Sequence, residues 1–138
     1  NSTATFFEKE LDISDFRPLV FFSENFYKTF VIKDNDDIAG YCLLGSYKSR
    51  CGYAQTAEIT IYLKPEFCGK GIGSKAITFI DQFAKNHNIH VIIAGVCTEN
   101  KSSMQMFLKN GYEQCAWFKQ VGFKFGRYLD TAYFQKVL

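Results

Sequence analysis

Three glycines, Gly69, Gly71 and Gly73, stand between a strand-like run and a helix-like run of the chain. Because glycine has no Cβ and tolerates left-handed backbone angles, such a loop brings its main chain close to a ligand. The helix that follows directly presents its first N–H groups and the positive end of its dipole to the loop. These residues predict an anion site suited to a phosphate group. A glycine-rich turn without any ligand has the same composition, so the pattern is weak by itself.

The spacing of these glycines excludes two common phosphate motifs. The Walker A loop needs Gly-x-x-x-x-Gly-Lys-[Ser/Thr], and the dinucleotide loop needs Gly-x-Gly-x-x-Gly with an acidic residue after the next strand. Neither arrangement is present, because the third glycine follows after one residue and no acidic residue ends the next strand. The segment 68–73 (CGKGIG) instead fits [Gln/Arg]-x-x-Gly-x-[Gly/Ala], with Cys68 in the first position.

Periodicity and turn residues predict the elements that hold this loop. Residues 59–63 alternate and are rich in β-branched side chains, which is typical of a strand, and Pro65 ends it because proline has no N–H to donate. A helix with an apolar stripe follows at 71–86. Further strands are expected at 2–7, 30–33, 38–44, 90–96, 112–118 and 128–136, and further helices at 12–26 and 102–110.

The connections between these elements carry their own signals. Residues 30–44 predict a β-hairpin, and 90–96 an apolar central strand covered on both faces. Asn100 or Ser102 can cap the helix that begins there, and Gly111 provides its left-handed end. A loop with Gly122 and Gly126 is expected between the last two strands. The order of elements predicts an α/β or α+β domain on a mixed sheet.

Length and composition narrow the class of protein. The 138 residues make one domain with a real core, and the net charge of +2 gives no electrostatic case for nucleic acid or an anionic membrane as partner. No apolar run approaches the roughly 20 residues of a transmembrane helix. The five widely spaced cysteines contain no Cys-x-x-Cys pair, which favours free thiols in a reducing cytoplasm. His87 and His90 lack further ligands, so no metal site is expected.

A polar, basic loop at 45–53 precedes the strand that leads to the glycines. Loops of this kind carry function more often than strands do. Lys48 and Arg50 are suited to hold an anionic group, although two solvated charges explain them equally well.

Several segments together resemble one known family. The segments 68–73 (CGKGIG), 100–103 (NKSS) and 109–112 (KNGY) are similar to the pyrophosphate loop and the N-x-x-S … K-x-G-[F/Y] block of the GNAT acyl-CoA N-acyltransferase superfamily. The segments 53–58 (YAQTAE) and 121–130 (VGFKFGRYLD) resemble the phosphinothricin/methionine sulfone N-acetyltransferase branch. The similarity is collinear over 2–138. Relative to that family the chain lacks an opening strand and a first helix, so Asn1 is not expected to be the start of the gene product.

This resemblance implies a fold and a reaction. The fold is a mixed, mostly antiparallel twisted sheet flanked by helices, with a splayed strand pair that binds acetyl-CoA, in a single domain over 1–138. The reaction is transfer of acetyl from acetyl-CoA to a primary amine through a direct tetrahedral intermediate. Glu58 aligns with the family's catalytic Glu and is the expected base, since the ammonium must lose a proton before it attacks; without the family, it would be interpreted as a surface residue.

The resemblance also implies where the ligands bind. The expected cofactor-binding residues are Ile61, Tyr62, Leu63, Cys68, Gly69, Lys70, Gly71, Ile72, Gly73, Ser74, Asn100 and Ser103. In the substrate site, Arg50 is a candidate for a substrate carboxylate, Lys48 a weaker one, and Tyr53 and Phe123 are candidate walls.

Two positions depart from the family pattern. Cys68 replaces the usual Gln or Arg, which removes a donor to phosphate but leaves the backbone N–H groups, so weaker cofactor binding is expected. Phe107 stands where relatives carry a Tyr or His that protonates the departing thiolate. Because a thiol pKa is near 8.5, the CoA thiolate leaves without a dedicated acid, and activity is still expected.

Three functions remain open from the sequence. The leading one is N-acetylation of a small-molecule amine, an amino acid or its analogue. The others are acetylation of a protein or peptide, and an acyl-CoA-binding module with little turnover, which Phe107 and Cys68 would suit. A dinucleotide-binding protein is a distant fourth. The family also forms homodimers through its C-terminal strands, with which the aromatic stretch 128–134 is compatible.

Overall fold

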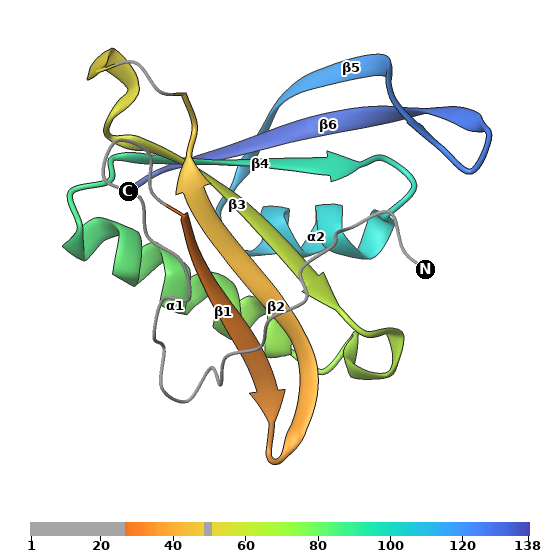
Figure 1. The fold of residues 1–138 in the computed structure, drawn as a ribbon, viewed down its shortest axis with the longest axis horizontal. Coiled ribbons are helices and arrows are strands. Elements are labelled where there is room, and N and C mark those ends of the chain that lie inside the picture. The colour runs from red at the N-terminus through yellow and green to blue at the C-terminus, as the bar shows by residue number, and fades with distance from the viewer. Residues whose placement is uncertain (1–26, 49–50) are drawn as a thin grey trace.

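The computed structural model describes residues 27–48 and 51–138, and these residues form a six-stranded sheet with two α-helices (Figure 1). The strands are β1 (Tyr27–Asp34), β2 (Asp37–Ser46), β3 (Thr56–Leu63), β4 (Val91–Cys97), β5 (Glu113–Lys124) and β6 (Arg127–Val137); the helices are α1 (Ile72–Asn86) and α2 (Lys101–Lys109), with 3-10 turns η1 (Cys51–Tyr53) and η2 (Pro65–Phe67). The strand expected at 2–7 and the helix expected at 12–26 lie outside the described residues.

The sheet is mixed and mostly antiparallel, as predicted. Its strand order is β1-β2-β3-β4-β6-β5, and β3 with β4 is the parallel pair of the described sheet. The β1–β2 hairpin is confirmed, with Asn35 at a left-handed φ of 59° in its turn. β4 is central, because β3 and β6 pair with it on either side.

β3 and β4 part before either strand ends. Their pairing runs from Thr56 opposite Val91 to Ile59 opposite Ala94, whereas β3 continues to Leu63 and β4 to Cys97. Figure 1 shows the two strands diverging toward the end that faces α2. Beyond Ile59, the backbone edge of β3 that faces β4 is therefore not engaged in that ladder. This is the splayed strand pair that the sequence predicts.

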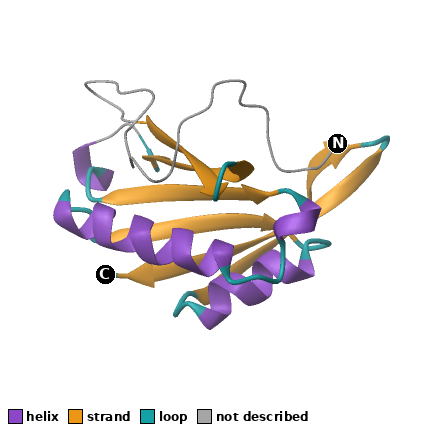
Figure 2. Ribbon diagram, turned by 90° about the horizontal axis from the view of Figure 1, so that it is seen from below, coloured by secondary structure: helices purple, strands orange, loops and turns teal. Residues whose placement is uncertain are grey.

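Both helices cover the same face of the sheet (Figure 2). α1 turns Ala76, Ile77 and Ile80 into the core, where they are at most 1% exposed and join the buried strand residues Ile59 and Ile92. Burial of one Ile side chain contributes roughly 1.5–3 kcal/mol, so this stripe fixes α1 firmly under β3 and β4. The position of the loop between β3 and α1 follows from this packing.

The start and end of α2 agree with the sequence prediction. The Oδ1 atom of Asn100 accepts a hydrogen bond from the backbone N–H of Ser103 at 3.1 Å, which makes Asn100 the N-cap. Gly111 follows the last turn with a φ of 90°. The cap fixes the N-terminal end of α2 next to the end of β4.

Two sequence predictions about the strands need correction. β4 was expected to be covered on both faces, but Ile92, Ala94 and Val96 are buried on one face while Gly95 on the other is exposed. The opposite face of β4 is not covered by α1 or α2, which both lie below the sheet (Figure 2).

β5 is also longer than predicted, and Gly122 lies within it rather than in a loop. An irregular stretch between Phe118 and Gly122 interrupts its pairing with β6. The carboxylate of Asp130 stabilises this stretch, since it accepts hydrogen bonds from the backbone N–H of Gln120 at 2.8 Å and from Nε1 of Trp117 at 2.9 Å. These two bonds lower the pKa of Asp130, so the group stays ionised. A local sequence pattern does not predict that β5 continues past residue 118, because the irregular stretch there is stabilised by Asp130 of the neighbouring strand.

A polar network links α1, α2 and β6. Asp81 accepts hydrogen bonds from the hydroxyl of Tyr112 at 2.8 Å and from Nζ of Lys136 at 2.7 Å, and that same Nζ donates to the carbonyl of Asn110 at 2.9 Å. Burial and the neighbouring Asp81 carboxylate raise the pKa of Tyr112, which therefore remains a donor. The network fixes the C-terminal end of α2 against α1.

Candidate active site

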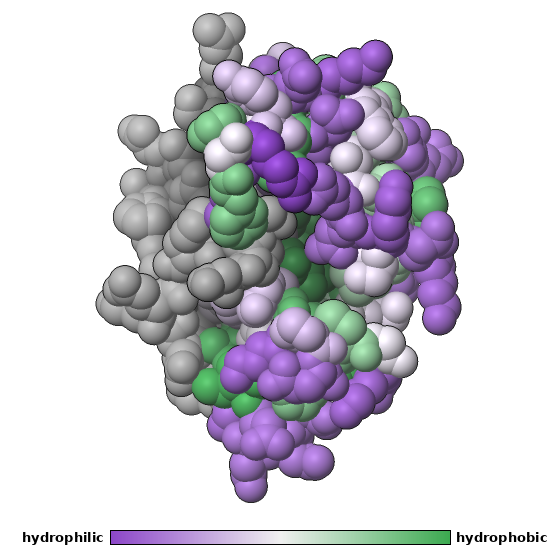
Figure 3. All heavy atoms as spheres, turned by 90° about the vertical axis from the view of Figure 1, so that its right-hand side faces the viewer, coloured by the Kyte–Doolittle hydropathy of each residue, from purple (hydrophilic) through white to green (hydrophobic). Residues whose placement is uncertain are grey.

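A cavity of about 570 Å³ opens where β3 and β4 part. Its wall is formed by the last residues of β3, the glycine loop, the start of α1 and one side of α2. The lining residues are Ile61, Tyr62, Leu63, Cys68, Gly69, Gly71, Gly73, Ser74, Asn100, Ser102, Ser103, Gln105, Met106 and Lys109. Seen from the right-hand side of Figure 1, the molecule is hollowed between polar side chains, with apolar side chains deeper in the hollow (Figure 3).

The glycine loop exposes its main chain to this cavity. Gly69 and Gly71 have φ angles of 78° and 80°, and a Cβ atom built on either one meets nothing within 4 Å. The open space at both positions shows that glycine is needed for the backbone angle and not for packing. At Gly73 the reason differs, because a Cβ there would collide with Sδ of Met106. That glycine lets α1 approach α2 closely.

The first turn of α1 has the features of an anion site. Its N-cap is Gly71, and no side chain caps it in the described part of the chain. Ile72, Gly73 and Ser74 therefore direct N–H groups without intrahelical partners toward the cavity, together with the positive end of the helix dipole. The sequence predicts a phosphate site here, and these N–H groups are the donors that it would use.

Ser74 adds a side-chain donor to the same wall. Its Oγ atom accepts a hydrogen bond from Nδ2 of Asn110 at 2.8 Å, and Asn110 is held in turn by a 2.7 Å bond to the carbonyl of Met106. Because Oγ already accepts, its own proton is available to a group in the cavity. Lys109, at the end of α2, lines the same cavity and contributes a positive charge.

Glu58 lies outside the cavity, on β3, three residues before Ile61. It pairs with Ile93 of β4 and, by strand alternation, points to the face of the sheet opposite the helices, since its neighbours Ala57 and Ile59 are buried in the core. Its side chain is half-buried, and this burial raises its pKa above the usual value for a glutamate. A carboxylate with a raised pKa is a better proton acceptor than an exposed one.

Two predicted cofactor residues do not line the cavity. Lys70 is exposed, with its Nζ 5.5 Å from the ring centre of Phe67, and Ile72 packs against the core. The other ten residues of the predicted set do line it.

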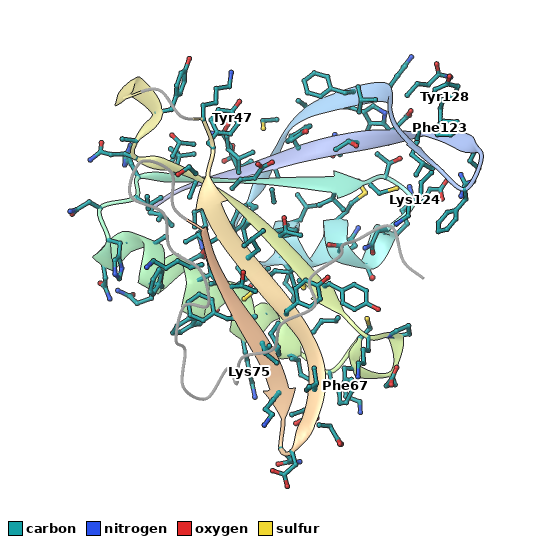
Figure 4. All side chains as sticks on the ribbon, viewed as in Figure 1. Tyr47, Phe67, Lys75, Phe123, Lys124 and Tyr128 are labelled. Carbon is teal, nitrogen blue, oxygen red and sulfur yellow. The ribbon has the colours of Figure 1, made fainter. Side chains whose placement is uncertain are left out.

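The predicted substrate residues are not brought together. Tyr53 stands in η1, where its ring lies 6.0 Å from that of Tyr47, and Nζ of Lys48 lies 5.3 Å from both rings. Phe123 is 64% exposed on the β5–β6 hairpin, far from Tyr47 in Figure 4, and its ring contacts Tyr128 at 5.0 Å. The two aromatic residues therefore do not form one wall within this chain. Arg50 lies outside the described residues.

Phe107 is a core residue. It is 2% exposed and its ring contacts those of Tyr112 and Phe134, at centroid distances of 5.1 and 6.3 Å. The position where the family resemblance predicts an acid therefore has a packing role here, and its side chain does not line the cavity.

Sequence reasoning missed one side of α2. Ser102, Gln105, Met106 and Lys109 line the cavity although none of them was predicted to. Their spacing of i, i+3, i+4 and i+7 is that of a single helix face, so projecting the predicted helix from its cap at Asn100 would have identified the stripe.

Comparison with known proteins decides the family. The chain matches the family described as Acetyltransferase (GNAT) domain over residues 2–133. This chain belongs to that family. The predicted family membership is confirmed, and the described sheet and helices have the GNAT fold.

The similar proteins include members of the predicted branch. The chain is 33% identical over 109 residues to the L-amino acid N-acyltransferase MnaT of Escherichia coli, covering 79% of this chain and 63% of that protein. It is 30% identical over 105 residues to the phosphinothricin N-acetyltransferase of Streptomyces coelicolor, covering 76% and 61%. The structure of a GNAT superfamily phosphinothricin acetyltransferase from Sinorhizobium meliloti in complex with AcCoA has a TM-score of 0.74 and 31% identity, covering 81% and 61%. The chain thus spans under two thirds of the length of these relatives.

No helix among the described residues is both long and apolar enough to cross a membrane. Nor does that part of the chain gather three or more His, Cys, Asp or Glu side chains into a metal-binding group.

Proposed function

We propose that this protein transfers the acetyl group of acetyl-CoA to the primary amine of a small molecule, an amino acid or an analogue of one. The observation that carries the proposal is the cavity at the parting of β3 and β4, which joins the uncapped start of α1 to the edge of β3 that β4 leaves unpaired. The names of the similar proteins support the same reaction: MnaT is an L-amino acid N-acyltransferase, and a Salmonella typhimurium relative acetylates L-methionine sulfoximine and L-methionine sulfone.

The residues of the cavity fit the chemical parts of acetyl-CoA. The main chain of 69–73 and the N-terminus of α1 would hold the pyrophosphate, with the hydroxyl of Ser74 as a further donor. The unpaired edge of β3 at 61–63 would pair with the amide groups of the pantetheine arm, as an added strand does. Asn100 and Ser103 would contact the cofactor from α2. When bound, acetyl-CoA supplies the activated acyl group.

Glu58 would act as the general base, directly or through a water molecule. It stands on β3 just before the strands part, on the face opposite the helices, and its raised pKa makes it a stronger proton acceptor than an exposed glutamate. The attacking amine is an ammonium at pH 7 and must lose one proton before its nitrogen can bond to the carbonyl carbon. The N–H groups of the free β3 edge would stabilise the charge that develops on the carbonyl oxygen.

Only the chemical class of the acceptor amine is proposed, and activity toward a panel of candidate acceptors would test this class. CoA release would be measured with a thiol reagent for amino acids, methionine sulfone, phosphinothricin, polyamines and N-terminal peptides. We expect the highest kcat/KM for an amino acid or analogue. A preference for peptides would favour a protein N-acetyltransferase, a possibility raised by the ribosomal-protein-alanine N-acetyltransferase of Brucella melitensis, whose structure has a TM-score of 0.75 and 31% identity. Binding of acetyl-CoA without CoA release would identify a binding module.

We also propose that the protein is a homodimer in the cytoplasm. β5 is one of the two edge strands of the described sheet, and exposed apolar side chains gather on it and its turn, including Trp117, Val121 and Phe125. The described cysteines other than Cys51 carry free thiols, which suits a reducing compartment. Light scattering after size exclusion would give the mass, and Val121→Lys is expected to shift a dimer toward monomer.

A further inference from the structure

Tyr133 of β6 lies at the point where β3 and β4 part. The last residue pair between those strands is Ile59 opposite Ala94, so Gly95 is the first residue of β4 beyond it. Gly95 pairs with Tyr133. Because strand residues alternate between the faces of a sheet, Tyr133 and Gly95 share a face with Glu58, opposite the buried core.

The ring of Tyr133 lies across β4 at this glycine. A Cβ atom built on Gly95 would stand 2.9 Å from Cε1 and 3.4 Å from Cζ of the tyrosine, which are atoms of the far half of the ring. The hydroxyl is therefore carried over β4 in the direction of β3, the strand that bears Glu58. Phe118 of β5 supports the ring from the other side, at a centroid distance of 5.3 Å and an interplanar angle of 63°.

Burial and two neighbouring groups favour the protonated form of the Tyr133 hydroxyl. Burial is the largest cause of its raised pKa, followed by the charge of Glu58 and then by Tyr47. Glu58 shares the face of the sheet with Tyr133 and stands on β3, the strand toward which the ring of Tyr133 extends across Gly95. The protonated phenol of Tyr133 is a proton donor, and the carboxylate of Glu58 is a proton acceptor on the same face of the sheet.

We propose that Tyr133 gives its proton to the departing thiolate. Phe107 cannot perform this role, because its side chain has no proton to donate. The inference rests on the proposed acetyl transfer. The ammonium first loses one proton through Glu58 to solvent. Glu58 then takes a second proton from the amine nitrogen as this atom bonds to the carbonyl carbon, while the C–S bond breaks and its electron pair goes to sulfur. The phenol proton of Tyr133 moves to that sulfur, and protonated Glu58 returns a proton to the phenolate. The sum of these steps is amide plus free thiol, with one proton carried from nitrogen to sulfur.

Tyr133→Phe tests this role while preserving the ring that packs on Gly95 and Phe118. We expect kcat to fall about 100-fold, toward the lower end of the range for general acids because the thiolate is a tolerable leaving group. The dissociation constant of acetyl-CoA, the KM for the amine and the thermal midpoint should stay unchanged. Tyr128→Phe removes a hydroxyl from an exposed ring of the same strand and should keep wild-type kcat.

The pH profile of kcat separates an acid from a merely structural residue. The titratable groups near Tyr133 are Glu58 of β3, Tyr47 after β2, and Cys115 of β5, whose Sγ donates to the backbone carbonyl of Tyr133. The wild-type protein should lose activity at alkaline pH as the phenol ionises, and Tyr133→Phe should lack that limb. In Glu58→Gln the residual alkaline limb should move to lower pH, because a negative neighbour that raises the pKa of Tyr133 is gone.

The outcomes separate the two proposals. A wild-type protein that acetylates amines, with Tyr133→Phe retaining full kcat or changing only KM, overturns the role of Tyr133 and leaves the proposed function standing. A wild-type protein that releases no CoA with any acceptor overturns both. A loss of kcat together with the loss of the alkaline limb supports the assignment.

Discussion

At the scale of single residues, the chemistry is divided between the two sides of the sheet. Glu58, the proposed base, stands on the face opposite the helices, whereas the proposed anion site at Gly71 opens into a cavity bounded by α1 and α2. The edge of β3 beyond Ile59 connects the two regions, since Glu58 lies just before the parting and Ile61 just after it. A thioester held along this edge would present its carbonyl carbon between the base and the cofactor loop.

Glu58→Gln should lower kcat by about 10²- to 10⁴-fold, the usual contribution of a general base, with little change in acetyl-CoA binding. Burial raises the pKa of Glu58, so the folded protein binds a proton more tightly than the unfolded chain. Stability is therefore lost as pH rises through the interval between the unfolded and folded pKa values. Glu58→Gln removes that loss, and its thermal midpoint at neutral pH should equal or exceed that of the wild type.

Steady-state kinetics and thermal melts between pH 5 and 9 would measure both effects. In the wild type, kcat should fall toward acid pH as Glu58 becomes protonated, and this acid limb should be absent from Glu58→Gln. Glu113→Gln, on exposed β5, is the matched control and should behave as wild type. Full activity of Glu58→Gln across this range would exclude Glu58 as the base.

Cys68→Gln should tighten acetyl-CoA binding. Cys68 lines the cavity at the mouth of the glycine loop, and an amide there would add a donor to the phosphate that a thiol does not offer. One hydrogen bond to a charged group contributes about 1.5–3 kcal/mol, so a dissociation constant lower by about tenfold or more is expected by calorimetry. Cys68→Ser is the control for loss of the thiol alone. Unchanged binding by Cys68→Gln would show that position 68 does not reach the phosphate.

At the scale of elements, local signals predict most of the architecture. The apolar stripe of α1, the cap at Asn100 and the hairpin turn at Asn35 each act within a few residues, and the structure has them as predicted. The bulge in β5 depends on Asp130 of the next strand, which a local pattern does not reveal. Tyr133 was missed for a similar reason: an aromatic residue in an alternating strand is typical of a core position, and only the pairing with Gly95 shows where its ring lies.

Local sequence patterns likewise predicted some parts of the candidate site and missed others. The glycine loop was predictable because its backbone angles require particular residue types, and Gly69 and Gly71 have the expected positive φ. The wall formed by α2 was not identified, since polar residues such as Ser102 and Gln105 look like a solvated helix face until the opposing β3 is in place. The substrate residues were predicted by family position alone, and that argument carries no information about the distance between Tyr53 and Phe123.

Gly71→Ala should weaken acetyl-CoA binding and cost about 1–2 kcal/mol of stability, because an L-residue at a φ of 80° is strained even where space is open. Binding calorimetry and urea unfolding would measure the two effects. Gly52→Ala is a matched control, since its Cβ also meets nothing within 4 Å and its φ is not positive. Equal stability of the two variants would argue against a constrained loop.

At the scale of the whole molecule, one polar network fixes the geometry of the cavity. Asp81 joins Lys136 of β6 to Tyr112 after α2, and Asn110 extends the network to Ser74 at the cavity wall. The position of α2 relative to α1, and with it the width of the cavity, depends on these contacts as well as on the core.

Asp81→Asn should destabilise the protein by about 1–3 kcal/mol, because Lys136 loses its carboxylate partner at a site where both side chains are largely buried. The acetyl-CoA dissociation constant should rise as α2 becomes less well held. Urea unfolding and calorimetry would test this, with Asp36→Asn at the exposed hairpin turn as control. If both variants had the wild-type midpoint, the network would not hold the helices together.

A co-crystal structure with acetyl-CoA tests the central claim most directly. We predict the pyrophosphate over the main chain of 69–73, the pantetheine arm along β3 at 61–63, and the thioester sulfur between Glu58 and Tyr133 where the strands part. Acetyl-CoA bound elsewhere on the molecule, or a thioester on the far side of α2 from Glu58, would contradict the account.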